Sequence, residues 1–161
     1  MLAGVCDGFI SNRIYTKYNV ATNDLINMGA PPGQIDSRQF RVCRLPMRVR
    51  ALLKKTGAGW YRYEAANPRI PLHDPLVHEM ITVWRESRSY AVREISEEEI
   101  LRHCIGALAE EGVRLLSEGI AQRMSDIDVV YVNGYGFPRE SGGPMFYASR
   151  MNWIAGTASS Q

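Results

Sequence analysis

The stretch of residues 96–116 decides the fold and reads SEEEILRHCIGALAEEGVRLL. Ser96 and Glu99 have the spacing of a capping box, in which the hydroxyl and the carboxylate each accept a hydrogen bond from a backbone amide at the start of a helix. Apolar side chains then recur every three or four residues, which is the period of one face of an α-helix. The residues of this stripe are Leu101, Cys104, Ile105, Leu108, Gly112, Leu115 and Leu116. We therefore predict one long amphipathic helix.

Three glutamates occupy the first turn of this predicted helix, at positions 97–99. Negative charges at that end interact favourably with the helix dipole, each by about 0.3–1 kcal/mol. This structural role is a sufficient explanation for the cluster of acids.

The same period marks a second long helix near the N-terminus, over residues 9–28, with Asp7 as its predicted N-cap. Gly29 and the run Pro31-Pro32-Gly33 end it, because proline cannot continue a helix. A short helical turn is expected around residues 34–40. The apolar stripe of the long helix consists of Phe9, Ile10, Ile14, Tyr18, Ala21, Leu25 and Met28.

Three shorter helices complete the predicted fold. One is expected over residues 76–84, one begins near Ser125 and is stopped by the glycines at 134 and 136, and one begins at Pro144. Residues 54–63 are interpreted as a connector that docks on the core, and residues 67–75 as turns. The polar tail, residues 156–161, is expected to fray. The fold class is therefore all-α.

Length and composition limit what the chain can be. Its 161 residues, 45% hydrophobic and 22% charged, are typical of one globular unit. A dinucleotide-binding half, built from strand and helix units of about 30 residues each, would not fit together with a substrate domain. No apolar run reaches the roughly 18 residues of a membrane span, so none is expected. Three widely spaced cysteines, Cys6, Cys43 and Cys104, predict reduced thiols and a cytoplasmic location.

Charge is unevenly distributed although the net charge is only +2. Residues 38–62 hold eight basic side chains and no acid. We consider three interpretations: a solvated face, a docking surface for an acidic partner or a nucleotide-bearing ligand, and nucleic-acid binding. The last is disfavoured, because base-stacking aromatic residues do not alternate with the charges and the overall basic excess is small.

One apolar run followed by Gly-x-Gly, VVYVNGYG at residues 129–136, is reminiscent of a nucleotide-binding strand and loop. The third glycine of that fingerprint is replaced by Arg139, and Pro138 intervenes. Only 25 residues follow Gly136, too few for the remaining strand and helix. We therefore reject nucleotide binding at this run.

Other catalytic patterns are also lacking in the sequence. His73, His78 and His103 do not have the spacing of metal ligands, so no metal site is expected and the three are interpreted as surface or partly buried. No Gly-x-Ser-x-Gly elbow occurs. Cys104 lies on the apolar stripe, where an inert core thiol is the usual finding.

Several motifs, in order, resemble one family. They are GFISNR at residues 8–13, TGAGWYRY at 56–63, SDID at 125–128, GYGFP at 134–138 and GGPMF at 142–146. Together they closely resemble the C-terminal helical region of L-3-hydroxyacyl-CoA dehydrogenases, best that of the multifunctional fatty-acid oxidation enzymes. The resemblance spans residues 4–148.

The resemblance implies a duplicated helical domain of the 6-phosphogluconate dehydrogenase C-terminal-like type. It implies a first repeat in residues 1–63 and a second in 64–161, together one compact domain. Within the first repeat the chain has only RQFRVCRLPMRVRALL, at residues 38–53, where the family carries a further loop and helical stretch. The first repeat is therefore interpreted as shortened, with the basic segment at the shortening.

The resemblance also implies a function. In the family the Rossmann domain, absent here, binds NAD and supplies the catalytic residues, so no cofactor or catalytic residue is expected in this chain. Asn12, the asparagine of the GFxxNR signature, is the one substrate-binding residue implied. The expected role is substrate binding and oligomerisation within an NAD-dependent (S)-3-hydroxyacyl-CoA dehydrogenase of fatty-acid β-oxidation. Expected partners are acyl-CoA, the Rossmann or enoyl-CoA hydratase module, and a second copy of the chain, without nucleic acid. The alternative is a non-catalytic helical scaffold derived from that domain.

Overall fold

The computed structural model describes residues 3–35, 61–64 and 67–154. The elements in that part of the chain are α1 (Phe9–Met28), α2 (Pro32–Ile35), β1 (Tyr61–Glu64), β2 (Asn67–His73), α4 (Pro75–Ser87), α5 (Glu97–Ser117), α6 (Met124–Gly134), the 3-10 turn η2 (Arg139–Ser141) and α7 (Pro144–Arg150). Helices dominate, as the all-α prediction requires. The sequence predictions for residues 36–60 and 156–161, including most of the basic segment, lie outside the described residues.

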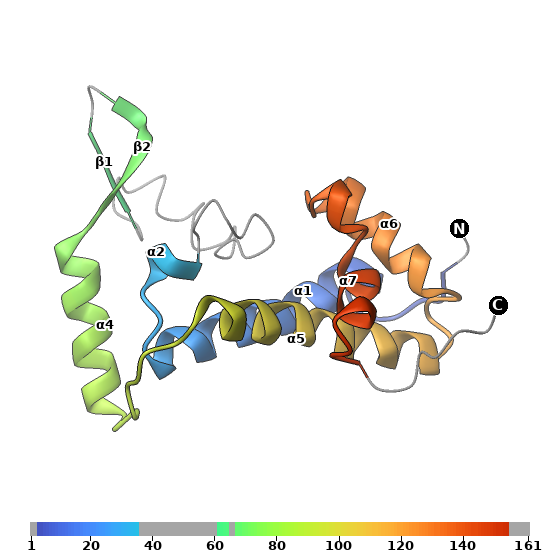
Figure 1. The fold of residues 1–161 in the computed structure, drawn as a ribbon, viewed down its shortest axis with the longest axis horizontal. Coiled ribbons are helices and arrows are strands. Elements are labelled where there is room, and N and C mark those ends of the chain that lie inside the picture. The colour runs from blue at the N-terminus through green and yellow to red at the C-terminus, as the bar shows by residue number, and fades with distance from the viewer. Residues whose placement is uncertain (1–2, 36–60, 65–66, 155–161) are drawn as a thin grey trace.

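The two long helices form the centre of the molecule. Helices α1 and α5 lie side by side, and α6 and α7 cover them at the end of the molecule where α1 begins (Figure 1). The predicted end of α1 at Gly29 and the predicted start of α5 after Ser96 are confirmed. Their facing sides supply the core, which includes Ile14, Leu25, Ile105, Leu108 and Leu115.

Helix α7 packs against α5 at a glycine. A Cβ atom added to Gly112 would lie 2.3 Å from Sδ of Met145, a side chain that is completely buried. Gly112 fits the apolar stripe by its spacing. Its lack of a side chain also leaves room for Met145 of α7.

The start of α5 confirms half of the predicted capping box. The Ser96 hydroxyl accepts a hydrogen bond of 3.2 Å from the Glu99 amide. The Glu99 carboxylate, however, accepts hydrogen bonds from the Arg93 guanidinium, one of them at 2.9 Å. A charged donor six residues earlier thus competes successfully for this carboxylate, because charge-assisted hydrogen bonds are the stronger kind.

The predicted Asp7 cap of α1 is wrong. Gly8 is the N-cap, with a left-handed φ of 77°, and among the described residues no side chain caps this end. The backbone satisfies one amide of the first turn instead, because Phe9 N–H donates to Cys6 O at 3.1 Å, and Asn12 N–H makes the first intrahelical bond, to Gly8 O at 3.1 Å. Phe9, placed in the apolar stripe by its spacing, is also a wrong assignment, because 60% of its surface is exposed.

The segment predicted to form turns contains an antiparallel hairpin. Strands β1 and β2 pair Tyr61 with His73 and Arg62 with Leu72, and an irregularity follows Arg62. The prediction of turns rested on proline residues, two of which lie in β2. A two-stranded sheet has only edges, so a proline that cannot donate to a ladder is tolerated there.

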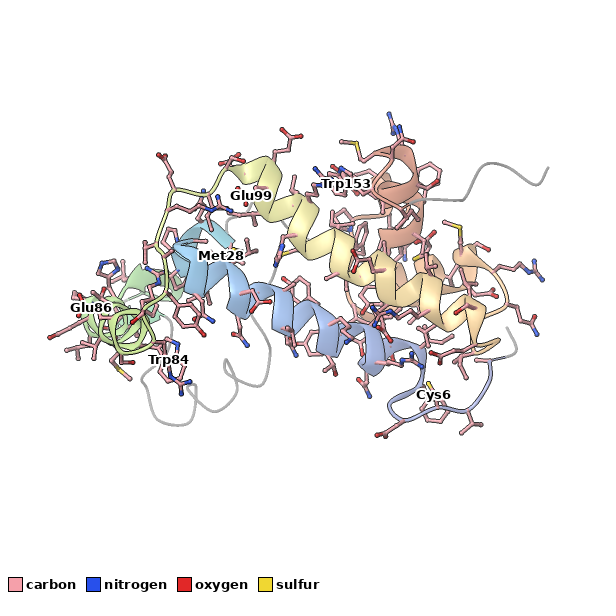
Figure 2. All side chains as sticks on the ribbon, turned by 90° about the horizontal axis from the view of Figure 1, so that it is seen from below. Cys6, Met28, Trp84, Glu86, Glu99 and Trp153 are labelled. Atoms are coloured by element: carbon pink, nitrogen blue, oxygen red, sulfur yellow. The ribbon has the colours of Figure 1, made fainter. Side chains whose placement is uncertain are left out.

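Helix α4 confirms the predicted short helix and lies with the hairpin at the end of the molecule away from α6 (Figure 1). Figure 2 shows its Trp84 and Glu86 at the end where Met28 closes α1, far from Cys6. Its buried Arg85 donates to the carbonyl oxygen of Ile26 at 2.8 Å and to that of Ala30 at 3.2 Å. The Ile26 carbonyl also accepts the Gly29 amide at 3.2 Å, so Arg85 adds a charged donor from α4 at the end of α1.

Candidate functional site

Asn12 lies on the exposed surface of α1, just after the first helical turn. Its side-chain oxygen Oδ1 accepts a hydrogen bond of 3.1 Å from the hydroxyl of Tyr135, which is the residue that caps the C-terminal end of α6. The two residues are 123 positions apart. The fold therefore joins the GFISNR motif to the GYGFP motif.

A cluster of tyrosines supports this junction. The Tyr135 ring stacks on Tyr131, with 5.0 Å between ring centroids, and contacts Tyr15 on α1 at 5.7 Å. Tyr131 is buried, and its hydroxyl donates to the Ser11 carbonyl at 3.4 Å. Burial raises the pKa of Tyr131 above its usual value, so the hydroxyl remains protonated. We define Tyr15, Tyr131 and Tyr135 as the tyrosine cluster.

The neighbouring residue of the motif, Arg13, has a structural role. Its guanidinium donates to the buried Glu111 at 2.5 Å and to both carboxylate oxygens of Glu118, at 2.5 and 2.7 Å. The bond from Arg13 lowers the pKa of Glu118 below its usual range. The arginine thus joins α1 to α5 and holds the face of α1 that presents Asn12.

The backbone at the start of α1 is unusual for a non-glycine residue. Phe9 has a φ of 50°, in the left-handed region, directly after Gly8 at 77°. The Phe9 side chain is 60% exposed, and Asn12, three residues later, is also exposed. Strained backbone is concentrated at functional sites. Sequence spacing could not reveal this conformation at Phe9, which Ser89 and Asn152 share elsewhere in the described chain.

Two further motifs have a joint structural role. Asp128 of SDID is buried and accepts hydrogen bonds from the amides of Met145, at 2.8 Å, and Phe146, at 3.2 Å, at the start of α7. A Cβ at Gly143 would lie 2.3 Å from its Oδ1, which explains the glycine of GGPMF. Burial raises the pKa of Asp128 to about 6, against the opposing effect of the two amides.

The run resembling a nucleotide-binding strand is helical. Residues 129–134 lie within α6, and Gly136, with a left-handed φ of 69°, follows its end. The Phe137 amide donates back to the Tyr131 carbonyl at 3.1 Å, a bond that closes the helix end. The run is therefore part of a helix and its C-terminal end, and not the strand and loop that the fingerprint requires.

A groove of about 630 Å³ lies between α1 and α5, and Asn12 is not part of its lining. Its charged side chains include Lys17 and Asp24 from α1 and Arg102 and Glu110 from α5, and His103 also lines it. Both signs are represented, so the groove shows no preference for an anion or a cation. Within the described part of the chain, no group of three His, Cys, Asp or Glu side chains is placed to hold a metal ion.

Cysteines and histidines agree with the sequence interpretation where they are described. Cys6 and Cys104 are free thiols, and Cys104 is completely buried on α5. His78 is exposed and His103 is partly buried. Over residues 3–35, 61–64 and 67–154, none of the helices is long and apolar enough to cross a membrane.

The chain is similar to curated proteins of fatty-acid oxidation, although no family model matches it. It is 47% identical to the peroxisomal bifunctional enzyme of Homo sapiens and 33% identical to that of Cavia porcellus, each over 92% of this chain and 27% of the relative. It is 27% identical to the glyoxysomal fatty acid beta-oxidation multifunctional protein MFP-a of Cucumis sativus, over 94% of this chain and 26% of the relative. The chain thus spans about a quarter of the length of these relatives.

The alignments also reveal a length difference. The stretch aligned with the Homo sapiens enzyme is 198 positions long, whereas this chain has 161 residues in total. At least 37 aligned positions therefore have no residue in this chain.

Proposed function

Because the chain is related over nine tenths of its length to the multifunctional enzymes of fatty-acid β-oxidation, we propose that it is the substrate-binding and oligomerisation domain of an NAD-dependent (S)-3-hydroxyacyl-CoA dehydrogenase. The observation that supports this most is the hydrogen bond between Asn12 and Tyr135. It brings together two of the motifs on which the family resemblance depends, at an exposed surface.

The role proposed for Asn12 is to donate a hydrogen bond to the substrate. Its oxygen is already bonded to Tyr135, so the amide N–H groups are the part of the side chain that remains to face a ligand. A donor placed at the oxygen of a 3-hydroxy or 3-oxo group would orient it and stabilise charge that develops there. In the complete enzyme NAD accepts the hydride, at a nucleotide site supplied by the Rossmann domain.

The 161 residues alone are proposed to be inactive. We expect no NADH from the purified protein with 3-hydroxybutyryl-CoA and NAD, because neither a dinucleotide fold nor a catalytic base is assigned to this chain. Absorbance at the NADH band measures this directly. NADH formation that scales with the concentration of the protein would contradict the proposal.

Binding is the positive test. We expect acetoacetyl-CoA to bind the protein in calorimetry, and Asn12→Ala to weaken binding about tenfold, the loss expected for one buried hydrogen bond. Asn23→Ala is the matched control, because Asn23 is exposed on α1 about three turns further along. Equal losses in the two variants would contradict a specific role for Asn12.

The domain organisation is part of the proposal. A duplicated 6-phosphogluconate dehydrogenase C-terminal-like domain with repeats at residues 1–63 and 64–161 would place α1 in one repeat and α5 in the other. The missing 37 or more aligned positions support a shortened repeat. We propose the parent enzyme's Rossmann or hydratase module and a second copy of the chain as partners. The cytoplasm stays our expected location, and the names of the peroxisomal relatives make the peroxisome the alternative.

A helical scaffold remains the second candidate, favoured by the exposed apolar side of α4. Leu76 and Met80 are 68% and 70% exposed, and Val83 continues the same stripe. Calorimetry and sedimentation distinguish the two candidates. A stable dimer that does not bind acetoacetyl-CoA would favour the scaffold, whereas binding that depends on Asn12 would favour the enzyme domain.

A further inference from the structure

The orientation of the Asn12 amide is determined by a residue on another helix. An asparagine side chain on a helix surface can rotate about its terminal bond, presenting either its oxygen or its nitrogen to a ligand. Here the oxygen accepts the Tyr135 hydroxyl at 3.1 Å, so the nitrogen with its two hydrogens is directed elsewhere. A donor that is fixed in advance binds more tightly than one that must be ordered on binding.

The Tyr135 hydroxyl is itself held in place by its surroundings. Its ring lies between Tyr131, at 5.0 Å, and Tyr15, at 5.7 Å, so the ring has contacts from both α6 and α1. The neighbouring Gly136, with a φ of 69°, ends α6 at this point and turns the chain away. Tyr135, the C-cap of α6, has 37% of its surface exposed, so the cluster lies at the surface of the molecule.

We propose that Tyr135 is the positioning residue for Asn12: its hydroxyl holds the side-chain oxygen of Asn12 so that the amide nitrogen is presented to the oxygen of the acyl substrate. This inference rests on the proposed function and adds the residue that determines the direction of the donor. It also explains why a tyrosine, instead of another aromatic residue, stands between the two glycines of GYGFP: phenylalanine would fill the same space without the hydroxyl.

A double-mutant cycle tests the proposal with acetoacetyl-CoA as the probe. Tyr135→Phe keeps the ring and removes the hydroxyl, and we expect it to weaken binding about two- to tenfold. In the Asn12→Ala background the same change should have no further effect, because the hydroxyl acts through Asn12. Equal losses in both backgrounds, or no loss in the first, would overturn the positioning role.

The side-chain amide of Asn12 gives a second readout that does not depend on the substrate. Its two N–H signals in an NMR spectrum are identified by their disappearance in Asn12→Ala. We expect Tyr135→Phe to shift them and to increase their motion, and Tyr147→Phe to leave them unchanged, because the Tyr147 ring, on α7, contacts Trp153 at 5.7 Å in a tilted arrangement. Unchanged Asn12 signals in Tyr135→Phe would overturn the inference.

Failure of the proposed function can be recognised separately. If the wild-type protein does not bind acetoacetyl-CoA while Tyr135→Phe still releases the Asn12 amide, the proposed substrate is wrong, and the substrate role of Tyr135 is overturned with it. If the wild type binds and Asn12→Ala weakens binding, but Tyr135→Phe changes neither binding nor the amide signals, only the positioning role is overturned.

Discussion

Helices α5 and α4 have similar sequence patterns but different surroundings in the folded chain. Both are amphipathic and both begin with a side-chain cap, from Ser96 and Asp74 respectively. The apolar side of α5 is covered by α1 and α7, whereas α4 exposes Leu76, Met80 and Val83. A periodic pattern therefore predicts that a helix forms, but the coverage of its apolar face depends on what the rest of the chain supplies.

The largest expected difference comes from one substitution made in each helix. Leu115→Ala on α5 removes a completely buried side chain and should reduce the free energy of unfolding by about 2–5 kcal/mol. Leu76→Ala on α4 removes a side chain that is mostly exposed and should change it by no more than about 0.5 kcal/mol. Chemical denaturation measures both. A loss at Leu76 as large as that at Leu115 would show that the exposed stripe of α4 is covered in solution.

The buried Asp128 gives the stability of the core a pH dependence. Its pKa of about 6 lies above that of an unfolded aspartate, so the folded protein holds this proton more tightly. The contribution of Asp128 to the free energy of unfolding should therefore fall as the pH rises from about 4 to 6, by up to about 3 kcal/mol. The control is Asp128→Asn, because the asparagine amide does not titrate in this pH range. A stability difference between the two proteins that is constant over this range would contradict the assignment.

Two glycines on α5 should have smaller effects on the free energy of unfolding when replaced by alanine, and the two effects should have opposite signs. Gly112→Ala would place a methyl group against Met145 and should cost about 1–3 kcal/mol. Gly106→Ala meets nothing within 4 Å among the described atoms and should gain about 0.5–1 kcal/mol from helix propensity. Thermal unfolding of both variants checks the signs. Two changes of the same sign would mean that α7 does not pack on α5 as described.

Much of the fold could be predicted from local pattern because helix boundaries depend on nearby residues. The C-terminal end of α1 and the start of α7 follow from Gly29 and Pro144. The N-cap of α1 was mispredicted because the chain adopts a left-handed turn at Gly8, where the Phe9 amide donates to the Cys6 carbonyl and not to Asp7. The hairpin was missed because proline argues against a strand that is paired on both sides, and its occurrence in β2 was therefore interpreted as a sign of turns.

The candidate site was only partly predictable, since most of it depends on contacts between distant residues. Asn12 came from the family resemblance alone, and nothing in its local pattern distinguishes it from an exposed polar residue. Its contact with Tyr135 requires α6 to end beside the start of α1, which no local rule specifies. The motifs at Asp128 and Gly143 became interpretable only when the fold brought them together.

The most direct test of the central claim is an NMR titration of the wild-type protein with acetoacetyl-CoA. We expect the backbone amide signals of Gly8, Asn12 and Tyr135 to shift together. Those of Leu76, Met80 and Val83 on α4 should not shift. Shifts confined to α4 would place the ligand on the exposed apolar stripe and contradict the account, as would a spectrum that does not change at any concentration of the ligand.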